Sequence, residues 1–218
     1  MGTKIKTCVI VGASPAADSA FMRPFFDQAD CIICADGGLL HLQKAGVAPH
    51  LLVGDFDSLQ QAANIPPQTQ VLPLPVHKDD TDLLVAVQEG FARGCTNFVL
   101  LGALGARADH TYGNFCILQY IAQQGGSAIL QDRGTQISLL LAGQTKTLSG
   151  VLGHTVSVFP FGCSSCTLTY HGLEYPLDHG TLVSHIPLGV SNVAVESTIE
   201  ITCHSGSALV MALSPQTV

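Results

Sequence analysis

The sequence contains no tryptophan and few charged residues, and these shortages exclude several classes of protein. Of its 218 residues, 9 are Lys or Arg and 16 are Asp or Glu, so the formal net charge is −7. So few cations in an acidic chain form no phosphate-binding surface, and we expect no nucleic-acid partner. Hydrophobic residues make up 47% of the sequence, too many for a disordered chain, and the length allows one large or two modest domains.

Long hydrophobic runs are also absent. None reaches the roughly 18 residues that span a bilayer, so we expect no membrane partner. The first apolar stretch, Cys8–Val11, is shorter than the roughly 7–15 residues of a signal-peptide core and is typical of a first β-strand. Eight cysteines lie mostly within Val, Ile and Leu stretches, as reduced core thiols do. This usage favours a cytoplasmic location.

The first part of the chain alternates between strand and helix patterns. Helices are predicted at Ala20–Ala29, Leu39–Ala45, Thr81–Arg93 and Tyr112–Gln124. Apolar strands are predicted at Thr7–Val11, Cys31–Ala35, Leu51–Val53, Val71–Leu74, Asn97–Leu101 and Ser127–Leu130. Because alternating strands and helices build parallel sheets with covered faces, residues 1–133 are predicted to form an α/β domain, a mostly parallel sheet flanked by helices.

The pattern changes near residue 136. Short strands rich in Thr, Ser and Val follow one another, and no segment has the period of a helix. The expected strands are Ile137–Leu141, Thr145–Leu148, Thr155–Pro160, Cys166–Tyr170, Thr181–Ile186, Val193–Val195, Ile199–Cys203 and Ala208–Leu213. Residues 136–218 are therefore predicted to form an all-β antiparallel sandwich. Only five charged residues occur there, which suggests that a partner subunit covers part of its surface.

Acidic and glycine-rich segments follow four of the predicted strands. They are Asp36–Gly38, Gly54–Ser58, His77–Asp82 and Gly102–His110. Because parallel strands end at one edge of their sheet, and ligands bind beyond that edge, these segments should meet at a single site. Several carboxylates facing one another need a cation between them, and Mg²⁺ prefers oxygen ligands and shares them with phosphates.

The spacing of the carboxylates supports this interpretation. Asp55 and Asp57 lie two residues apart and point to the same side of an extended chain. Asp82 falls in the first turn of a predicted helix, which Asp80 or Thr81 would cap. Arg107 and Lys78 would neutralise phosphate charge. The glycine-rich signatures GxxxxGK[ST] and GxGxxG are absent, so the chain is not expected to use either phosphate-binding loop.

The spacing of the cysteines makes zinc a less attractive metal than Mg²⁺, because no set of His and Cys residues has the spacing of a zinc site. Cys31 and Cys34 lie three apart in a predicted strand and face opposite sides of it. Cys163 and Cys166 lie in a predicted turn and could form a disulfide or hold a metal, but no second pair stands at zinc-ribbon distance.

Five motifs resemble those of a known family. ADGG (Ala35–Gly38), GDFDS (Gly54–Ser58), KDDTD (Lys78–Asp82), GALGARADH (Gly102–His110) followed by Asn114, and GVSN (Gly189–Asn192) occur in the order and spacing of bacterial thiamin pyrophosphokinases. The resemblance covers nearly the whole chain. It implies a catalytic α/β domain, a β-sandwich that binds thiamin and forms a homodimer with active sites at the interface, and transfer of pyrophosphate from ATP to thiamin with release of AMP.

The resemblance also implies roles for individual residues. Asp55, Asp57, Asp82 and Arg107 would be catalytic, with the three aspartates holding Mg²⁺. The residues expected to bind ATP are Asp36, Lys78, Asp79, Thr81, Asp109, His110 and Asn114, and those expected to bind thiamin are Ser191 and Asn192. The chain departs from the family pattern at Ala106, where glycine is usual, and at Val193-Ala194, where glutamate and an aromatic residue are frequent.

Three other functions fit parts of the sequence. A pyrophosphokinase that acts on a pterin alcohol could use the same carboxylates. A phosphatase of the haloacid-dehalogenase type also places a DxD motif after a strand, but no later acidic motif completes its metal site. A sensor would bind nucleotide or thiamin without releasing AMP.

Overall fold

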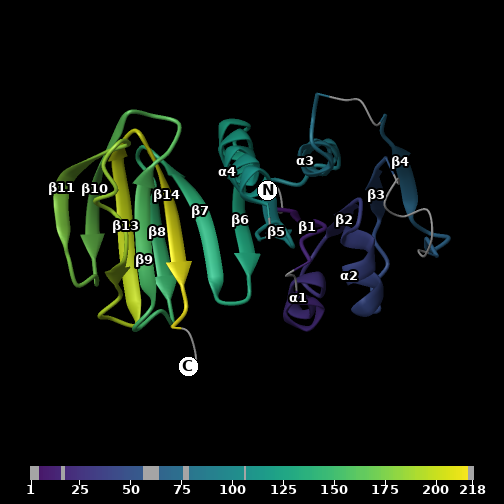
Figure 1. The fold of residues 1–218 in the computed structure, drawn as a ribbon, viewed down its shortest axis with the longest axis horizontal. Helices are drawn as coiled ribbons and strands as arrows, with labels where there is room; N and C mark the ends of the chain where they lie inside the picture. Colours follow the sequence, from purple (N-terminus) through teal and green to yellow (C-terminus); the bar gives the residue numbers. More distant parts are fainter. Residues whose placement is uncertain (1–4, 16–17, 56–63, 76–78, 106, 216–218) are drawn as a thin grey trace. The chain divides into compact units, whose positions relative to one another are not determined.

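The structure is a computed structural model that describes residues 5–15, 18–55, 64–75, 79–105 and 107–215. The chain divides into two compact units, Met1–Arg133 (unit 1) and Gly134–Val218 (unit 2) (Figure 1). Among the described residues, we find no helix with both the length and the apolar character that crossing a membrane requires.

Unit 1 contains a parallel β-sheet. Its strands are β1 (Thr7–Val11), β2 (Cys31–Ala35), β3 (Leu51–Gly54), β4 (Gln70–Pro73), β5 (Asn97–Leu101) and β6 (Ser127–Asp132). In space their order is β6-β5-β1-β2-β3-β4, and every neighbouring pair is parallel. The chain thus builds the sheet outward from β1 in both directions, and the order reverses between β1 and β5. In open parallel sheets, such a reversal marks the place where ligands bind.

Helices cover both faces of this sheet. They are α1 (Ser19–Phe26), α2 (Gly38–Lys44), α3 (Asp82–Ala92) and α4 (Ala108–Gln123). Figure 1 shows α1 and α2 on one side and α3 and α4 on the other. Met22 of α1 and Leu39 of α2 pack on Val9 and Val11 of β1, while the buried side chains of α3 and α4 face the opposite side. The predicted α/β architecture of this part is confirmed.

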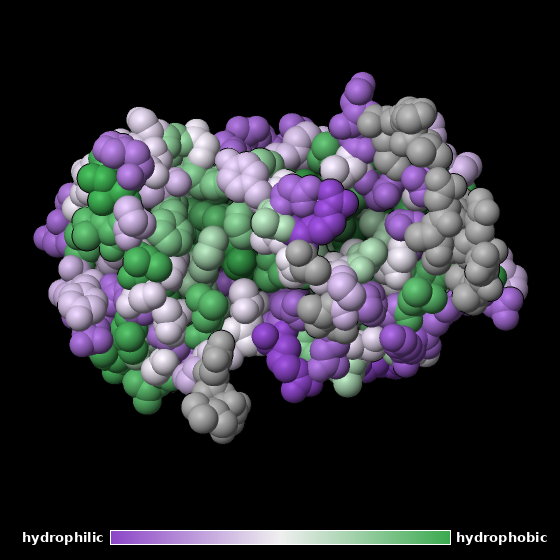
Figure 2. Space-filling view, viewed as in Figure 1, coloured by the Kyte–Doolittle hydropathy of each residue, from purple (hydrophilic) through white to green (hydrophobic). Residues whose placement is uncertain are grey.

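Unit 2 is built from antiparallel strands. They are β7 (Thr135–Leu141), β8 (Thr145–Ser149), β9 (Thr155–Pro160), β10 (Ser165–His171), β11 (Leu177–Val183), β12 (Asn192–Val193), β13 (Thr198–Ser205) and β14 (Ser207–Leu213). Two layers, β12-β9-β14-β7 and β11-β10-β13-β8, enclose one core that includes Val158 and Val210 from the first and Leu168 and Ile201 from the second. The predicted β-sandwich is confirmed. Hydrophobic residues also reach its surface, visible as green atoms over these strands in Figure 2.

The largest differences from the predicted bounds occur in α4 and β11. Helix α4 begins at Ala108, four residues before the predicted start at Tyr112, because its first turn is polar and lacks the apolar period used to find it. Strand β11 spans Leu177–Val183 rather than the predicted Thr181–Ile186. Its Asp-His-Gly segment is typical of a turn, but the strand includes it, with His179 at φ +49° and a register shift in the pairing with β10.

Candidate functional site

A cavity of about 670 Å³ lies beyond the carboxyl ends of the strands of unit 1. Its lining includes Asp36 after β2, Asp55 after β3, Thr81 and Asp82 at the start of α3, Gly102–Gly105 after β5, and Arg107, Asp109, His110 and Asn114 at the start of α4. All four polar segments predicted to meet therefore contribute described residues to one cavity. The two loops that flank the strand-order reversal also line it.

Asp36 is held in place by its backbone. Its φ of +44° lies in the left-handed region, which residues other than glycine rarely adopt. Its N–H donates to the Val53 carbonyl oxygen at 2.7 Å. Gly54 allows this close approach, since a Cβ added there would lie 3.2 Å from the Cα of Asp36. Strands β2 and β3 thus present the carboxylates of Asp36 and Asp55 to the same cavity.

Asp82 is positioned by the start of helix α3. The Thr81 side chain caps this helix, accepting a hydrogen bond from the Leu84 N–H at 3.3 Å, so the predicted cap at Asp80 or Thr81 is Thr81. Asp82 is the first helical residue, where the exposed N–H groups of the first turn attract negative charge. A carboxylate, or a phosphate bound beside it, is favoured at this position.

Arg107 and Asp109 form a two-pronged ion pair at the start of α4. Arg107 donates from Nε to Oδ1 at 3.2 Å and from Nη2 to Oδ2 at 2.6 Å, and the His110 N–H adds a bond to Oδ1 at 2.9 Å. The Arg107 guanidinium, helped by the His110 N–H, lowers the pKa of Asp109 to about 2. Both side chains are largely exposed. Asp109 therefore already neutralises part of the positive charge of Arg107 before a ligand binds.

Asn114 joins helix α4 to the glycine-rich loop after β5. Its Nδ2 donates to the Ala103 carbonyl oxygen at 2.6 Å. In that loop Gly102 has φ +60° and Gly105 has φ +130°, conformations that glycine adopts without strain. Backbone geometry and this amide contact both help to hold the loop in shape.

The sequence did not identify the loop after β1 as part of the site. Ala13, Ser14 and Pro15 line the cavity, and His41 of α2 donates from Nε2 to the Ser14 carbonyl oxygen at 2.9 Å. The buried Ser14 Oγ and His41 Nδ1 have no hydrogen-bond partner among the described residues. Burial lowers the pKa of His41, so its neutral form is favoured. The glycine that ends the first strand was the available signal, since it sits at the same edge as the acidic segments.

The donor atoms of the cavity suit a hard divalent cation. Asp36, Asp55 and Asp82 offer carboxylate oxygens, although these oxygens do not all lie within 4.8 Å of one another among the described residues. Mg²⁺ in enzymes that use nucleotides is commonly held by one or two carboxylates, with substrate phosphates and water completing its octahedron. The residues of this cavity therefore fit Mg²⁺ bound together with a polyphosphate.

One described residue of the predicted ATP site does not line this cavity. Asp79 is exposed and is not among its lining residues. Asp57 and Lys78 lie outside the described residues.

Ser191 and Asn192 belong to unit 2. Ser191 has φ +59°, and its N–H donates to Ser157 Oγ at 3.0 Å. The Asn192 side chain holds Tyr175, accepting from its N–H at 3.0 Å and donating to its carbonyl oxygen at 2.8 Å. Its amide group therefore serves to position a neighbouring segment that carries the exposed Tyr175 ring.

Two family models match the chain. Residues 22–130, half of its length, match the model described as the thiamin pyrophosphokinase catalytic domain, and residues 143–208 match the thiamin pyrophosphokinase vitamin B1 binding domain. All described residues that we name in the cavity, except Ala13–Pro15, fall within the first match.

Individual proteins give a consistent picture. Thiamine pyrophosphokinase of Bacillus subtilis is 27% identical over 196 residues, covering 88% of this chain and 92% of that protein, and thiamine pyrophosphokinase 3 of Oryza sativa is 26% identical over 223 residues, covering 89% and 82%. The crystal structure of thiamin pyrophosphokinase from Geobacillus thermodenitrificans superposes with a TM-score of 0.81 at 27% identity, covering 97% of this chain and 99% of that one. The B. subtilis structure shares the fold, with a TM-score of 0.85 at 24% identity over 97% and 100% of the two chains. The chain belongs to the thiamin pyrophosphokinase family.

Proposed function

We propose that the chain transfers the terminal pyrophosphate of ATP to the hydroxyethyl group of thiamin, giving thiamin diphosphate and AMP. The observation that carries the proposal is the cavity at the strand-order reversal of unit 1, which joins the carboxylates of Asp36, Asp55 and Asp82 to an arginine and to the start of helix α4. Polyphosphate transfer needs this combination, because its catalysis rests on positioning and on neutralising charge.

In the proposed reaction the thiamin hydroxyl oxygen attacks the β-phosphorus of ATP in line. An oxygen–phosphorus bond forms, the bond between the β-phosphorus and the bridging α,β-oxygen breaks, and AMP leaves with that oxygen. Asp55, Asp57 and Asp82 are the proposed ligands of Mg²⁺, which when bound supplies positive charge to the phosphate oxygens. The proton of the hydroxyl passes to a carboxylate of the cavity or to water.

The other lining residues hold the nucleotide in this proposal. The Arg107 guanidinium donates to phosphate oxygens, exchanging part of its contact with Asp109. The N–H groups that open α4 favour the same negative charge. The remaining proposed ATP-binding residues are Asp36, Lys78, Asp79, Thr81, Asp109, His110 and Asn114.

Unit 2 supplies the proposed thiamin-binding residues. Ser191 and Asn192 lie within the segment that matches the vitamin B1 binding domain. We assign pyrimidine recognition to this segment. Asn192 contributes to it by positioning the neighbouring loop that its side chain holds. The exposed apolar side chains of unit 2, among them Ile186, Leu188 and Val190, support a homodimer that covers them. A cytoplasmic location is part of the same proposal.

Matched aspartate variants test the site. D55N and D82N each remove one negative charge from the cavity with little change in volume, and D27N makes the same change at an exposed residue of the surface. We expect kcat/KM for thiamin to fall by about 10²-fold or more in D55N and D82N, the loss typical of enzymes from which one group that stabilises transition-state charge is removed. In D27N we expect kcat/KM to remain unchanged. Chromatography of AMP and thiamin diphosphate provides the rates. Full turnover by both cavity variants at saturating Mg²⁺ contradicts the proposed site.

The same assay separates the alternatives. AMP that forms only in the presence of thiamin supports the proposal, whereas AMP formation with a hydroxymethylpterin identifies a pterin pyrophosphokinase. Free phosphate identifies a phosphatase, and nucleotide binding without AMP identifies a sensor. The two family models and the named relatives all favour thiamin over these alternatives.

A further inference from the structure

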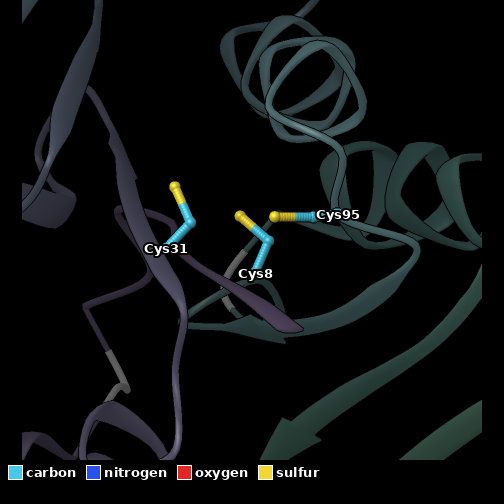
Figure 3. Close-up of side chains that lie close together, drawn as sticks. All are labelled: Cys8, Cys31 and Cys95. Atoms are coloured by element: carbon cyan, nitrogen blue, oxygen red, sulfur yellow. The ribbon is translucent and has the colours of Figure 1, made fainter. Parts of the chain in front are cut away.

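Three cysteines from distant parts of the sequence meet inside unit 1. Cys8 lies in β1, Cys31 begins β2, and Cys95 precedes β5. All three are buried and free, and their sulfur atoms lie within 4.8 Å of one another. Figure 3 shows the three side chains gathered at this point. The cluster lies at the amino ends of the strands, whereas the proposed active site lies at their carboxyl ends.

The fold itself brings the three sulfur atoms together. Cys8 and Cys31 are paired in register across the parallel strands β1 and β2, so their side chains point to the same face of the sheet. The end of helix α3 covers this face: Gly90 approaches Cys8, and the Cys95 N–H donates to the Gly90 carbonyl oxygen at 3.1 Å. Three buried positions therefore converge without any sequence spacing typical of a metal motif.

The surroundings of the cluster are polar on one side. Cys31 and Cys95 line a second cavity, of about 540 Å³, whose other residues are Lys6, Asp30, His50, Gln68, Gln70 and Arg93. Buried thiols also occur as ordinary residues of a hydrophobic core. Thiols that border a polar cavity instead combine burial with a route by which an ion can enter.

We infer that Cys8, Cys31 and Cys95 form a binding site for a single thiophilic d¹⁰ cation, Zn²⁺ or Cu⁺. A cation at the centre of an equilateral triangle with sides of 4.8 Å lies about 2.8 Å from each corner, and Zn–S bonds are about 2.3 Å long, so each sulfur needs to move by only about 0.5 Å. Thiolates select soft cations, so Mg²⁺ does not compete for this site. Binding releases the thiol protons as the three metal–sulfur bonds form.

The charge of the second cavity favours Zn²⁺ over Cu⁺. Three thiolates with Zn²⁺ carry a charge of −1, and with Cu⁺ a charge of −2. Lys6, Arg93 and Asp30 together give the cavity lining a formal charge of +1, with Arg93 also paired to Glu89 outside it. The lining therefore balances the zinc-bound cluster more closely. Water entering from the cavity completes the four ligands that zinc usually takes.

His50 does not serve as a ligand in the conformation observed. Its Nδ1 accepts a hydrogen bond from the Ile32 N–H at 3.0 Å, so in the neutral ring Nε2 carries the hydrogen. The imidazole therefore offers a donor to the cavity, suited to a bound water or a thiolate. The site is accordingly assigned to three sulfur ligands and one exchangeable position.

Metal titration of the full chain tests this assignment. Reduced, metal-free protein is titrated with Zn²⁺ against a chromophoric chelator, with Co²⁺ to record the sulfur-to-metal charge-transfer absorption, and anaerobically with Cu⁺ against a Cu⁺-specific chelator. We expect one equivalent bound per chain, a charge-transfer band with Co²⁺ and a raised melting temperature. Tight binding of either d¹⁰ ion supports the site, and competition between the two decides which occupies it.

Serine variants locate the ligands. C31S and C95S should each weaken Zn²⁺ binding by 100-fold or more and abolish the Co²⁺ band. C34S and C116S are the matched controls, one buried in the same strand as Cys31 and one exposed on α4, and they should bind as the parent does. Circular dichroism establishes that each variant is folded, and C31A and C95A replace any serine variant that is not.

Two results overturn the inference. One is the absence of stoichiometric Zn²⁺ or Cu⁺ binding while all eight thiols are titratable. The other is binding that survives in both C31S and C95S. Binding that persists when peptide mass mapping shows a disulfide between cluster cysteines counts as the same result. Loss of pyrophosphoryl transfer in D55N or D82N bears on neither result, because those residues lie at the opposite edge of the sheet.

Discussion

Replacing Gly38 with alanine should destabilise unit 1 at the turn that presents Asp36. Gly38 is the first residue of helix α2 and lies against the end of strand β1. A Cβ added to Gly38 would lie 2.1 Å from the Val11 carbonyl oxygen, 2.8 Å from the Val11 carbonyl carbon and 3.2 Å from the Gly12 carbonyl oxygen. These atoms belong to the backbone of a buried strand, so no flexible side chain can move aside.

The size of the effect follows from these distances. Ordinary contact needs more than 3 Å between the Cβ and the oxygen, so the first turn of α2 or the end of β1 must move by about 1 Å. Overpacking of a buried site typically costs 1–3 kcal/mol, and a clash with backbone belongs near the upper limit, about 3 kcal/mol. The better helix propensity of alanine offsets up to about 1 kcal/mol. We therefore expect G38A to lower the free energy of unfolding by about 2 kcal/mol and the melting temperature by about 4–8 °C.

G113A is the matched control for this prediction. Gly113 lies within helix α4 with an ordinary φ, and an added Cβ there meets no atom within 4 Å. The same chemical change should therefore leave stability unchanged or raise it by up to about 1 kcal/mol. Thermal and urea unfolding of the parent and both variants measure the difference. Equal melting temperatures for G38A and G113A would refute the argument from close approach.

Two further changes test the cap of α3 and the buried imidazole of the cavity wall. T81A removes the acceptor of the Leu84 N–H and should lower the free energy of unfolding by about 1 kcal/mol, while T81S restores it; equal urea midpoints for the two variants would contradict the capping role. Burial lowers the pKa of His41 below its ordinary 6.5, so as the pH falls the unfolded chain takes up the proton before the folded chain does. The contribution of His41 to stability is therefore fully present above pH 6.5 and decreases at lower pH. H41Q keeps a donor for the Ser14 carbonyl and cannot be protonated, so urea unfolding between pH 7.5 and 5.5 should show a smaller loss of stability in H41Q than in the parent; parallel curves would exclude His41 as the cause.

Much of the α/β unit was predictable because its signals are local. Strands β1, β2 and β5 have the predicted bounds, since in each an apolar run leads directly to a glycine or an aspartate. The convergence of Asp36, Asp55 and Asp82 was also predictable, because parallel strands end at one edge whatever their order. That inference does not require knowledge of which strands are neighbours in the sheet.

Features that depend on strand order or on backbone detail could not be predicted. The loop Ala13–Pro15 joins the site only because β1 lies beside β5, a pairing that no residue pattern reports. The cysteine cluster has the same origin, since Cys8 and Cys31 meet through the register of β1 and β2. The preference for Mg²⁺ over zinc relied on spacing along the sequence, and spacing carries no information about such a contact.

The strand-order reversal also explains why glycine follows β1. The Gly12 N–H donates to the Leu101 carbonyl oxygen at 2.8 Å, and the Ser14 N–H donates to the Gly102 carbonyl oxygen at 3.0 Å, so the two loops at the reversal are joined along their backbones. A Cβ on Gly12 would lie 2.6 Å from the Gly102 carbonyl oxygen, which only glycine avoids. Because the two strands lead to helices on opposite faces of the sheet, their loops diverge beyond this contact. The cavity is the space left by that divergence, and the carboxylates surround it because their strands end at the same edge.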